Sequence, residues 1–304
     1  MFRWVRWARL SASKVEETRM TRMSIRHQTQ YRYGRPVRFG VHRMLLRPRD
    51  SHAGRIVSAT LELYPPGRTS WTYDALGNCV CWYQPEGESA ELDIVSNLVM
   101  DRFPAEPVAL AIQDPDTAAP IIYTLADRAV LAPFIAPVSE ADPWVLRWMR
   151  EQMGRPDEPV LDFLARLNMT IHQGFQYGER PEEGVQSPAE TLQCGAGTCR
   201  DLAWLMIETL RILGYAARFV TGYLHSANAG RLGSGATHAW CEVFLPDIGW
   251  IEFDPTNGLV ESPDLIRVAT TRTPGEALPV QGKIIGDPHT CEMFVAVDVR
   301  IIDG

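Results

Sequence analysis

The 304-residue sequence lacks several features that would place it in a specialised class of protein. No stretch approaches the ~18 consecutive apolar residues that a membrane-spanning helix needs. The six cysteines are too few for a disulfide-stabilised scaffold of this length, which makes a reducing cytoplasm the simplest compartment. The formal net charge of −7 and the lack of a basic stripe argue against a nucleic-acid partner.

Residues 1–23 also lack the pattern of a signal peptide. Arginines there alternate with Trp4, Trp7 and Leu10 at helical spacing, and no uninterrupted apolar run of roughly 7–15 residues follows the basic start. A helix on a membrane surface is one interpretation of this pattern. We favour the other, a disordered or overextended N-terminus, because chain termini are often poorly ordered.

The rest of the chain divides into three segments. Residues 24–102 consist of short strand patterns separated by turn residues, which predicts an N-terminal antiparallel β-sandwich-like domain. Residues 103–138 begin with a proline-rich stretch of little periodicity and are predicted to be a linker and connecting segment. Residues 139–304 carry helical patterns, then strands, and end on a closing strand, which predicts an α+β catalytic core.

The sequence predicts neither a metal nor a cofactor. Cys79 and Cys81 are too close for an ordinary disulfide and lack a second pair of metal ligands. His27 and His42 lie in strand patterns with no carboxylate or cysteine cluster around them. No nucleotide-binding motif is present.

A glycine-rich turn delivers Cys199 to the start of a predicted helix. Apolar residues recur at helical spacing from Leu202 onward, and Gly214 supplies the C-terminal stop. Free backbone N–H groups and the positive end of the helix dipole stabilise a thiolate at such a position. Cys199 is therefore a candidate nucleophile, although most buried cysteines are simply small apolar residues.

Two strand patterns downstream flank a short turn and predict an antiparallel hairpin. A register that pairs Phe244 with Trp250 brings His238 and Asp254 to the same face of the hairpin. A loop one residue shorter puts the two side chains on opposite faces. A catalytic function therefore requires the first register or an equivalent offset.

The same register has a second consequence, because it places Glu242 opposite Glu252. Like charges that face each other across a hairpin are destabilising. We therefore expect a nearby cation, such as an arginine, to accompany this pair.

Three motifs in chain order then resemble a known family: GTCRDLA around Cys199, THAWCEVF around His238 and GWIEFDPTN around Asp254. They resemble the transglutaminase-like superfamily of papain-related thiol enzymes, specifically its two-domain bacterial branch. The resemblance covers about residues 160–260, and the N-terminal strand pattern is similar to the domain that accompanies this core. It implies that Cys199 is the nucleophile, His238 the general base and acid, and Asp254 the group that orients the imidazole.

The parts of the site outside this triad are less defined. The backbone N–H of Cys199 is expected to stabilise the oxyanion. Gln193 lies six residues before Cys199, the spacing of the oxyanion-hole glutamine in papain-like proteases, and Trp240 is a second candidate for the oxyanion site or cleft. Residues 269–275 do not reproduce the Gly-Arg-Asp run of many relatives, so the substrate stays open.

The sequence thus predicts a cysteine protease, amidase or transglutaminase-like acyltransferase that acts on a peptide or protein. Hydrolysis is preferred over cross-linking, because water competes for any exposed thioester and no amine site is evident. A non-catalytic peptide-binding module of the same fold is the alternative, but such a module has no need of all three triad residues. A thiol-based acetyltransferase would use the same triad with a cofactor donor, for which no binding motif is present.

Overall fold

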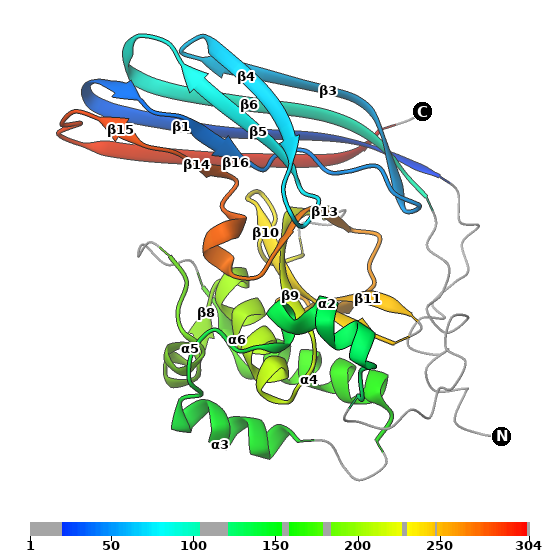
Figure 1. Ribbon diagram of the computed structural model, residues 1–304. Helices are drawn as coiled ribbons and strands as arrows, with labels where there is room; N and C mark the ends of the chain where they lie inside the picture. The colour runs from blue at the N-terminus through cyan, green and yellow to red at the C-terminus, as the bar shows by residue number, and fades with distance from the viewer. Residues whose placement is uncertain are drawn as a thin grey trace.

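The computed structural model describes residues 20–103, 121–153, 158–178, 184–226, 230–246 and 248–302. It has a mixed α+β architecture, in which two antiparallel sheets form an N-terminal domain and helices pack with a further sheet in the core below it (Figure 1). Of residues 1–23, which were expected to be a disordered or overextended N-terminus, residues 1–19 lie outside the described residues. Residues 21–23 instead begin the strand β1 (Thr21–Phe39), because their backbones pair with residues 100–102.

Two antiparallel sheets build the N-terminal domain. Inward-facing residues of its longest strand alternate with outward-facing ones, as shown by the buried Met23, Ile25, His27 and Thr29. In the larger sheet, β15 (Ile284–Ile285) and β16 (Cys291–Ile302) both pair with β1 (Thr21–Phe39), which is followed by β6 (Glu88–Arg102) and β3 (Gly54–Tyr64). The smaller sheet has the order β14 (Val280–Gln281), β2 (His42–Met44), β5 (Cys79–Pro85) and β4 (Gly67–Tyr73).

The C-terminal strand differs from the expectation that it closes the catalytic core of residues 139–304. β16 pairs with β1 from Cys291 opposite Tyr33 to Ile302 opposite Arg22, so the end of the chain returns to the N-terminal domain (Figure 1). Alternating apolar residues predict the strand itself, but its partner lies more than 250 residues away, and no local pattern encodes that pairing.

The core domain below the N-terminal sheets is a five-stranded sheet packed against helices. The sheet has the order β12 (Leu259–Val260), β11 (Gly249–Asp254), β10 (His238–Leu245), β9 (Ala217–Leu224) and β13 (Leu265–Thr271). Helix α6 (Cys199–Ile212) is buried on nearly all sides, and its apolar residues share one core with β9, β10 and β11. Three more helices cover this core: α3 (Pro143–Gln152), α4 (Val160–Gly174) and α5 (Pro188–Cys194).

The segment expected to connect the domains contains a helix of its own. Helix α2 (Leu125–Ile135) begins at the N-cap Thr124, and its Leu131 and Phe134 are buried against Ala216 of the core. Only two of its side chains are fully buried, so the periodicity that would predict this helix is weak.

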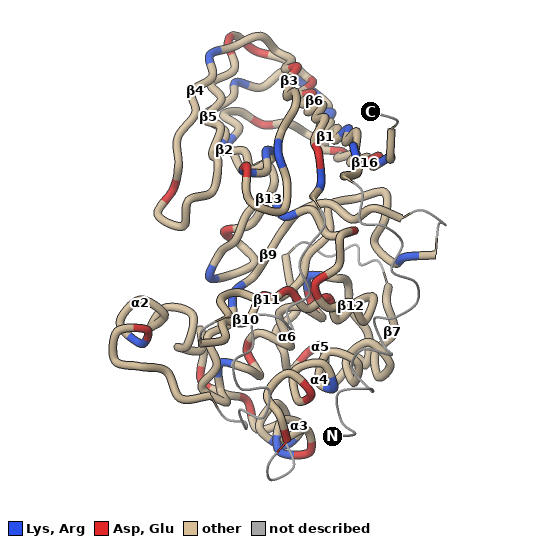
Figure 2. Tube along the Cα trace, turned by 90° about the vertical axis from the view of Figure 1, so that its right-hand side faces the viewer, with Lys and Arg blue, Asp and Glu red and all other residues tan. Residues whose placement is uncertain are grey.

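The described part of the chain contains no disulfide and no cluster of metal ligands. Its six cysteines are all free, and no group of three or more potential metal ligands is present among its residues. None of its helices combines the length and apolarity needed to cross a bilayer. Basic and acidic residues are interspersed over both domains (Figure 2).

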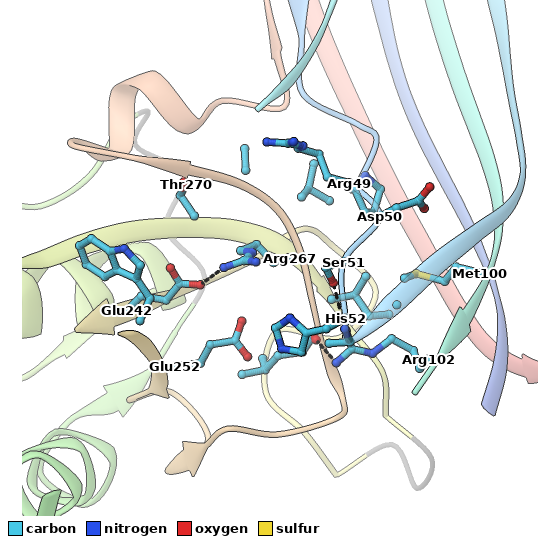
Figure 3. A pocket seen from close by; sticks show the side chains of 18 of the residues that line it. Arg49, Asp50, Ser51, His52, Met100, Arg102, Glu242, Glu252, Arg267 and Thr270 are labelled. Carbon is cyan, nitrogen blue, oxygen red and sulfur yellow. Dashed lines mark hydrogen bonds and ion pairs between the residues drawn. The ribbon is translucent and has the colours of Figure 1, made fainter. Parts of the chain in front are cut away.

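Charged side chains line a cavity of about 330 Å³ between the two domains (Figure 3). Glu242 of β10 is completely buried there, and its carboxylate accepts hydrogen bonds from Arg218 Nε at 2.5 Å and from Arg267 Nη1 at 2.8 Å. Arg102 of the N-terminal domain donates to the carbonyl of Leu265 at 3.1 Å. The Arg102 hydrogen bond therefore joins the domains at this cavity, beside the ion pairs that Glu242 forms within the core.

Glu242 and Glu252 lie directly opposite each other, as the sequence predicted. The two arginines on Glu242 are the cations that we expected beside this pair. Glu252 points into the cavity (Figure 3), where burial and the nearby carboxylates of Glu242 and Glu261 raise the pKa of Glu252 above its ordinary value.

Candidate active site

The turn before Cys199 depends on two glycines. Gly195 ends α5 in the left-handed conformation with φ of 62°, which a side chain disfavours. At Gly197 an added Cβ would lie only 2.8 Å from Asp201 Cβ, so a larger residue would clash. This close approach lets the Asp201 carboxylate fold back and accept hydrogen bonds from the backbone N–H and hydroxyl of Thr198, at 2.8 and 2.9 Å.

Cys199 is the first residue of α6, as the sequence predicted. Backbone N–H groups in the first turn of a helix have no partner within the helix, and the helix dipole is positive there. The Cys199 side chain is 6% exposed and belongs to the main core cluster. It therefore combines a desolvated setting with donors that favour negative charge.

The hairpin that carries the other two candidate residues has the predicted register. Phe244 pairs with Trp250, and this register continues along the strands to Cys241 and Phe253. His238 at the start of β10 and Asp254 at the end of β11 consequently meet on one face. Their side chains are fully buried, and His238 Nε2 lies 2.9 Å from Asp254 Oδ2.

The environment of His238 favours its charged form. Burial alone would lower the pKa of the imidazole, but the Asp254 carboxylate, its hydrogen bond and the Cys199 side chain outweigh burial and raise the pKa of His238 to about 10. Burial would likewise raise the pKa of Asp254. His238 and donors from Asn257 and Thr256 reverse that effect and hold the pKa of Asp254 below its usual range.

The second ring nitrogen of His238 is available to the cysteine. Nδ1 is buried and has no aligned hydrogen bond to any described residue, whereas Nε2 is already occupied by Asp254. The Cys199 side chain lies near enough to the ring to stabilise the imidazolium. The three residues thus form a sequence of sulfur, imidazole and carboxylate, which can move a proton between the sulfur and a bound substrate.

The two other candidates, Trp240 and Gln193, occupy different positions. Trp240 is completely buried, and its ring stacks on that of His238 with centroids 6.0 Å apart, so it supports the imidazole from beneath. Its Nε1 has no hydrogen-bond partner among the described residues. Gln193 is exposed on the last turn of α5, and no described contact brings it to Cys199.

Sequence reasoning missed two residues beside the triad. Asn257 donates from Nδ2 to Asp254 Oδ2 at 2.9 Å, and Gly233 lies against His238 Nδ1. Asn257 ends the GWIEFDPTN motif, and its spacing from Asp254 is typical of a short polar turn, which could have marked it. Gly233 lies in a glycine-rich loop, where composition alone does not indicate which glycine meets the ring.

Two family models match the chain. The model described as the transglutaminase-like superfamily matches residues 147–255, which include Cys199, His238 and Asp254. The model described as the bacterial transglutaminase-like N-terminal region matches residues 23–101.

Individual relatives extend this result. An uncharacterized protein of Mycobacterium tuberculosis is 28% identical over 298 residues, covering 93% of this chain and 94% of the relative. An uncharacterized protein of Mycobacterium leprae is 24% identical over 283 residues, which is 92% of this chain and 99% of the relative. A protein-glutamine gamma-glutamyltransferase of Pseudomonas aeruginosa is 30% identical over 119 residues, but these make up only 36% of this chain and 17% of that protein.

A solved structure shows the same two-domain fold. The crystal structure of a candidate cysteine protease from Cytophaga hutchinsonii superposes with a TM-score of 0.71 and 20% identity, covering 94% of this chain and 92% of that one. The matched models, the order of the motifs and this shared fold agree. The chain belongs to the transglutaminase-like superfamily and carries the bacterial transglutaminase-like N-terminal region.

Proposed function

We propose that the protein is a cysteine-dependent acyl-transfer enzyme that acts on peptide or amide bonds through a thioester at Cys199. The observation that carries the proposal is the buried His238, whose Nε2 is bound to Asp254 and whose Nδ1 is left for Cys199. A non-catalytic binding module would gain nothing from holding an imidazole in this position. The substrate class that we propose is a peptide or protein.

The first step forms the thioester. The Cys199 thiolate attacks the acyl carbon, and the backbone N–H of Cys199 at the helix start stabilises the oxyanion. The His238 imidazolium then gives its proton to the leaving nitrogen, so that the C–N bond breaks and an amine or ammonia departs. Asp254 holds the ring in the tautomer and orientation that this transfer needs.

The second step resolves the thioester. His238, now neutral, takes a proton from water as the oxygen attacks the acyl carbon, and the Cys199 thiolate leaves as the carboxylic acid forms. Water is the acceptor that we propose first, because no amine site is evident in the sequence. Transfer to an amine is the second candidate, and the name of the partly matching Pseudomonas aeruginosa relative, a gamma-glutamyltransferase, favours it.

The cellular setting that we propose is a reducing one. All six cysteines are free, including Cys194 and Cys291, which are exposed. A thiolate nucleophile keeps its reactivity best where such thiols stay reduced. The cytoplasm meets this condition.

A peptide library with glutamine side chains, incubated with and without a primary amine, tests the proposal. Mass spectrometry and an ammonia assay then distinguish backbone cleavage, deamidation and amine adducts. We expect cleavage or ammonia release in both arms, and adducts in the amine arm if transfer is the reaction.

Cys199→Ala is the decisive variant, and Cys194→Ala, which removes an exposed thiol five residues away, is its matched control. Products should vanish in the first variant and persist in the second. Products that persist in Cys199→Ala would contradict the mechanism. Peptide binding without any product would instead favour the binding module.

A further inference from the structure

The short loop of residues 230–236, which leads into β10, lies directly against the imidazole of His238. A Cβ atom added to Gly233 would stand 2.8 Å from His238 Nδ1 and 3.3 Å from Cε1. The hydroxyl of Tyr177 lies 3.4 Å from the same point. The loop backbone therefore borders the nitrogen that the proposed mechanism uses, and the position of this loop bears on access to it.

The side chain of Asn257 joins this loop to the carboxylate of the triad. Asn257 Oδ1 accepts from the backbone N–H of Leu232 at 2.9 Å, and Nδ2 donates to the Leu232 carbonyl at 3.2 Å. The same Nδ2 donates to Asp254 Oδ2 at 2.9 Å. That carboxylate oxygen is also the partner of His238 Nε2.

Two other contacts fix the loop but do not reach the triad. Arg231 forms an ion pair with Asp264, in which Nη2 lies 2.5 Å from Oδ2. The carbonyl of Gly235 accepts from the backbone N–H of Val297 in β16, at 2.9 Å. Of these three anchors, Asn257 alone also bonds to Asp254.

We propose that Asn257 is a positioning residue, which holds the Asp254 carboxylate against one side of the His238 ring and the Gly233 backbone against the other. Asn257 does not touch a reacting atom, so its effect passes through Asp254 and through the loop. The proposal rests on the proposed function, since it concerns the same imidazole. It adds that Asn257 influences both the protonation state of the imidazole and how closely the loop covers it.

The expected effect on charge has a definite sign. The Asn257 hydrogen bond is one of the contacts that lower the pKa of Asp254, so its loss raises that pKa. Asp254 then takes up a proton at a higher pH, and the imidazolium loses its counter-charge. Another titratable side chain next to this turn is His172 of α4, whose Nδ1 lies 2.8 Å from the Thr256 carbonyl oxygen.

The test is the rate at which iodoacetamide labels Cys199 from pH 4 to pH 9, followed by mass spectrometry on the intact full-length chain. In Asn257→Ala we expect the acid limb of this profile to shift to higher pH by about one unit. A shift of this size is expected when a charged group loses a hydrogen bond. Asn257→Asp keeps an acceptor for the Leu232 N–H but replaces the donor to Asp254 with a carboxyl group. Its acid limb should move at least as far.

Ser234→Ala is the control within the loop, because it removes only the bond from Ser234 Oγ to the Arg231 carbonyl and leaves Asn257 in place. Its acid limb should coincide with that of the wild type. A wild-type limb in both Asn257 variants would overturn the inference while leaving the proposed function intact. If Cys199 is not labelled selectively in the wild type, the proposed function is contradicted, and so is the inference that rests on it.

Two glycine substitutions test the contact between the loop and the Nδ1 side of the His238 ring. Gly233 and Gly235 both have positive φ, 82° and 90°, so alanine carries the same backbone strain at each. Only at Gly233 does the new methyl group meet His238, since nothing lies within 4 Å of the corresponding point at Gly235. Gly233→Ala should slow Cys199 labelling by about tenfold or more relative to Gly235→Ala, and equal rates would contradict the placement of the loop.

Discussion

The middle and the open end of the β10–β11 hairpin hold buried charge in two different ways. At the domain junction both oxygens of Glu242 are bonded to arginines, Arg218 and Arg267. At the open end of the hairpin His238 Nε2 is bonded to Asp254, and Nδ1 has no hydrogen-bond partner among the described residues. A charge whose hydrogen bonds are complete stabilises the fold, whereas an incomplete network leaves an atom able to react.

The most direct test of this difference neutralises one carboxylate at each of the two positions, Asp254 and Glu242. Asp254→Asn keeps the shape of the side chain but removes the charge that holds the imidazolium. Activity should fall by on the order of 10⁴, the loss expected when a triad carboxylate becomes an amide. Turnover of any substrate found in the library assay is the measurement, and a loss below tenfold would contradict the role of Asp254.

Glu242→Gln should lower the stability of the fold, in contrast to Asp254→Asn, which should lower activity. The substitution leaves Arg218 and Arg267 without their carboxylate, and removing one partner of a fully buried pair costs about 3–5 kcal/mol. We expect a smaller loss, about 2–3 kcal/mol, because the Arg267 side chain stays 42% exposed to water. Urea unfolding measures it, and an unchanged free energy of unfolding would show that these ion pairs do not stabilise the fold.

The pH dependence of stability tests whether the His238 imidazole is charged in the folded chain. The pKa of this imidazole is raised from 6.5 to about 10 in the folded chain, so its stabilising contribution is complete below pH 6.5 and is lost as the pH rises toward 10. The difference in unfolding free energy between the wild type and His238→Gln should therefore shrink between pH 7 and pH 10. A difference that stays constant would mean that the imidazole is neutral throughout.

Glu252 gives the smallest expected effect, and a gain in stability rather than a loss. Because its pKa is raised in the folded chain, the wild type loses stability as the pH climbs above the ordinary value of 4.5. Glu252→Gln should be more stable than the wild type by about 1 kcal/mol at pH 7, and less so at pH 4. Glu88→Gln, at an exposed position on β6, is the control and should give no such trend.

Local patterns were sufficient to predict much of the core domain and of the candidate site. Strand residues alternate with a period of two, so fixing Phe244 opposite Trp250 also fixed His238 on the same face as Asp254. The start of α6 at Cys199 followed from its glycine turn and its apolar spacing. Both predictions depended on contacts close in sequence.

Features that depend on distant contacts could not be predicted in this way. The pairing of β16 with β1 joins the two ends of the chain, and the partners of Glu242 come from β9 and β13, which follow β10 in the sheet. Gly233 meets His238 because three separate anchors hold its loop. Such contacts require the folded chain and leave no periodic signal in the sequence.

The relative labelling rates of the cysteines test the central claim most directly. A limiting dose of iodoacetamide near neutral pH, followed by mass spectrometry, reports how fast each thiol reacts. Although Cys199 is only 6% exposed, we predict that it reacts faster than the exposed Cys194 and Cys291, and that His238→Ala abolishes this advantage. Slow labelling of Cys199, or fast labelling that persists without His238, would contradict the account.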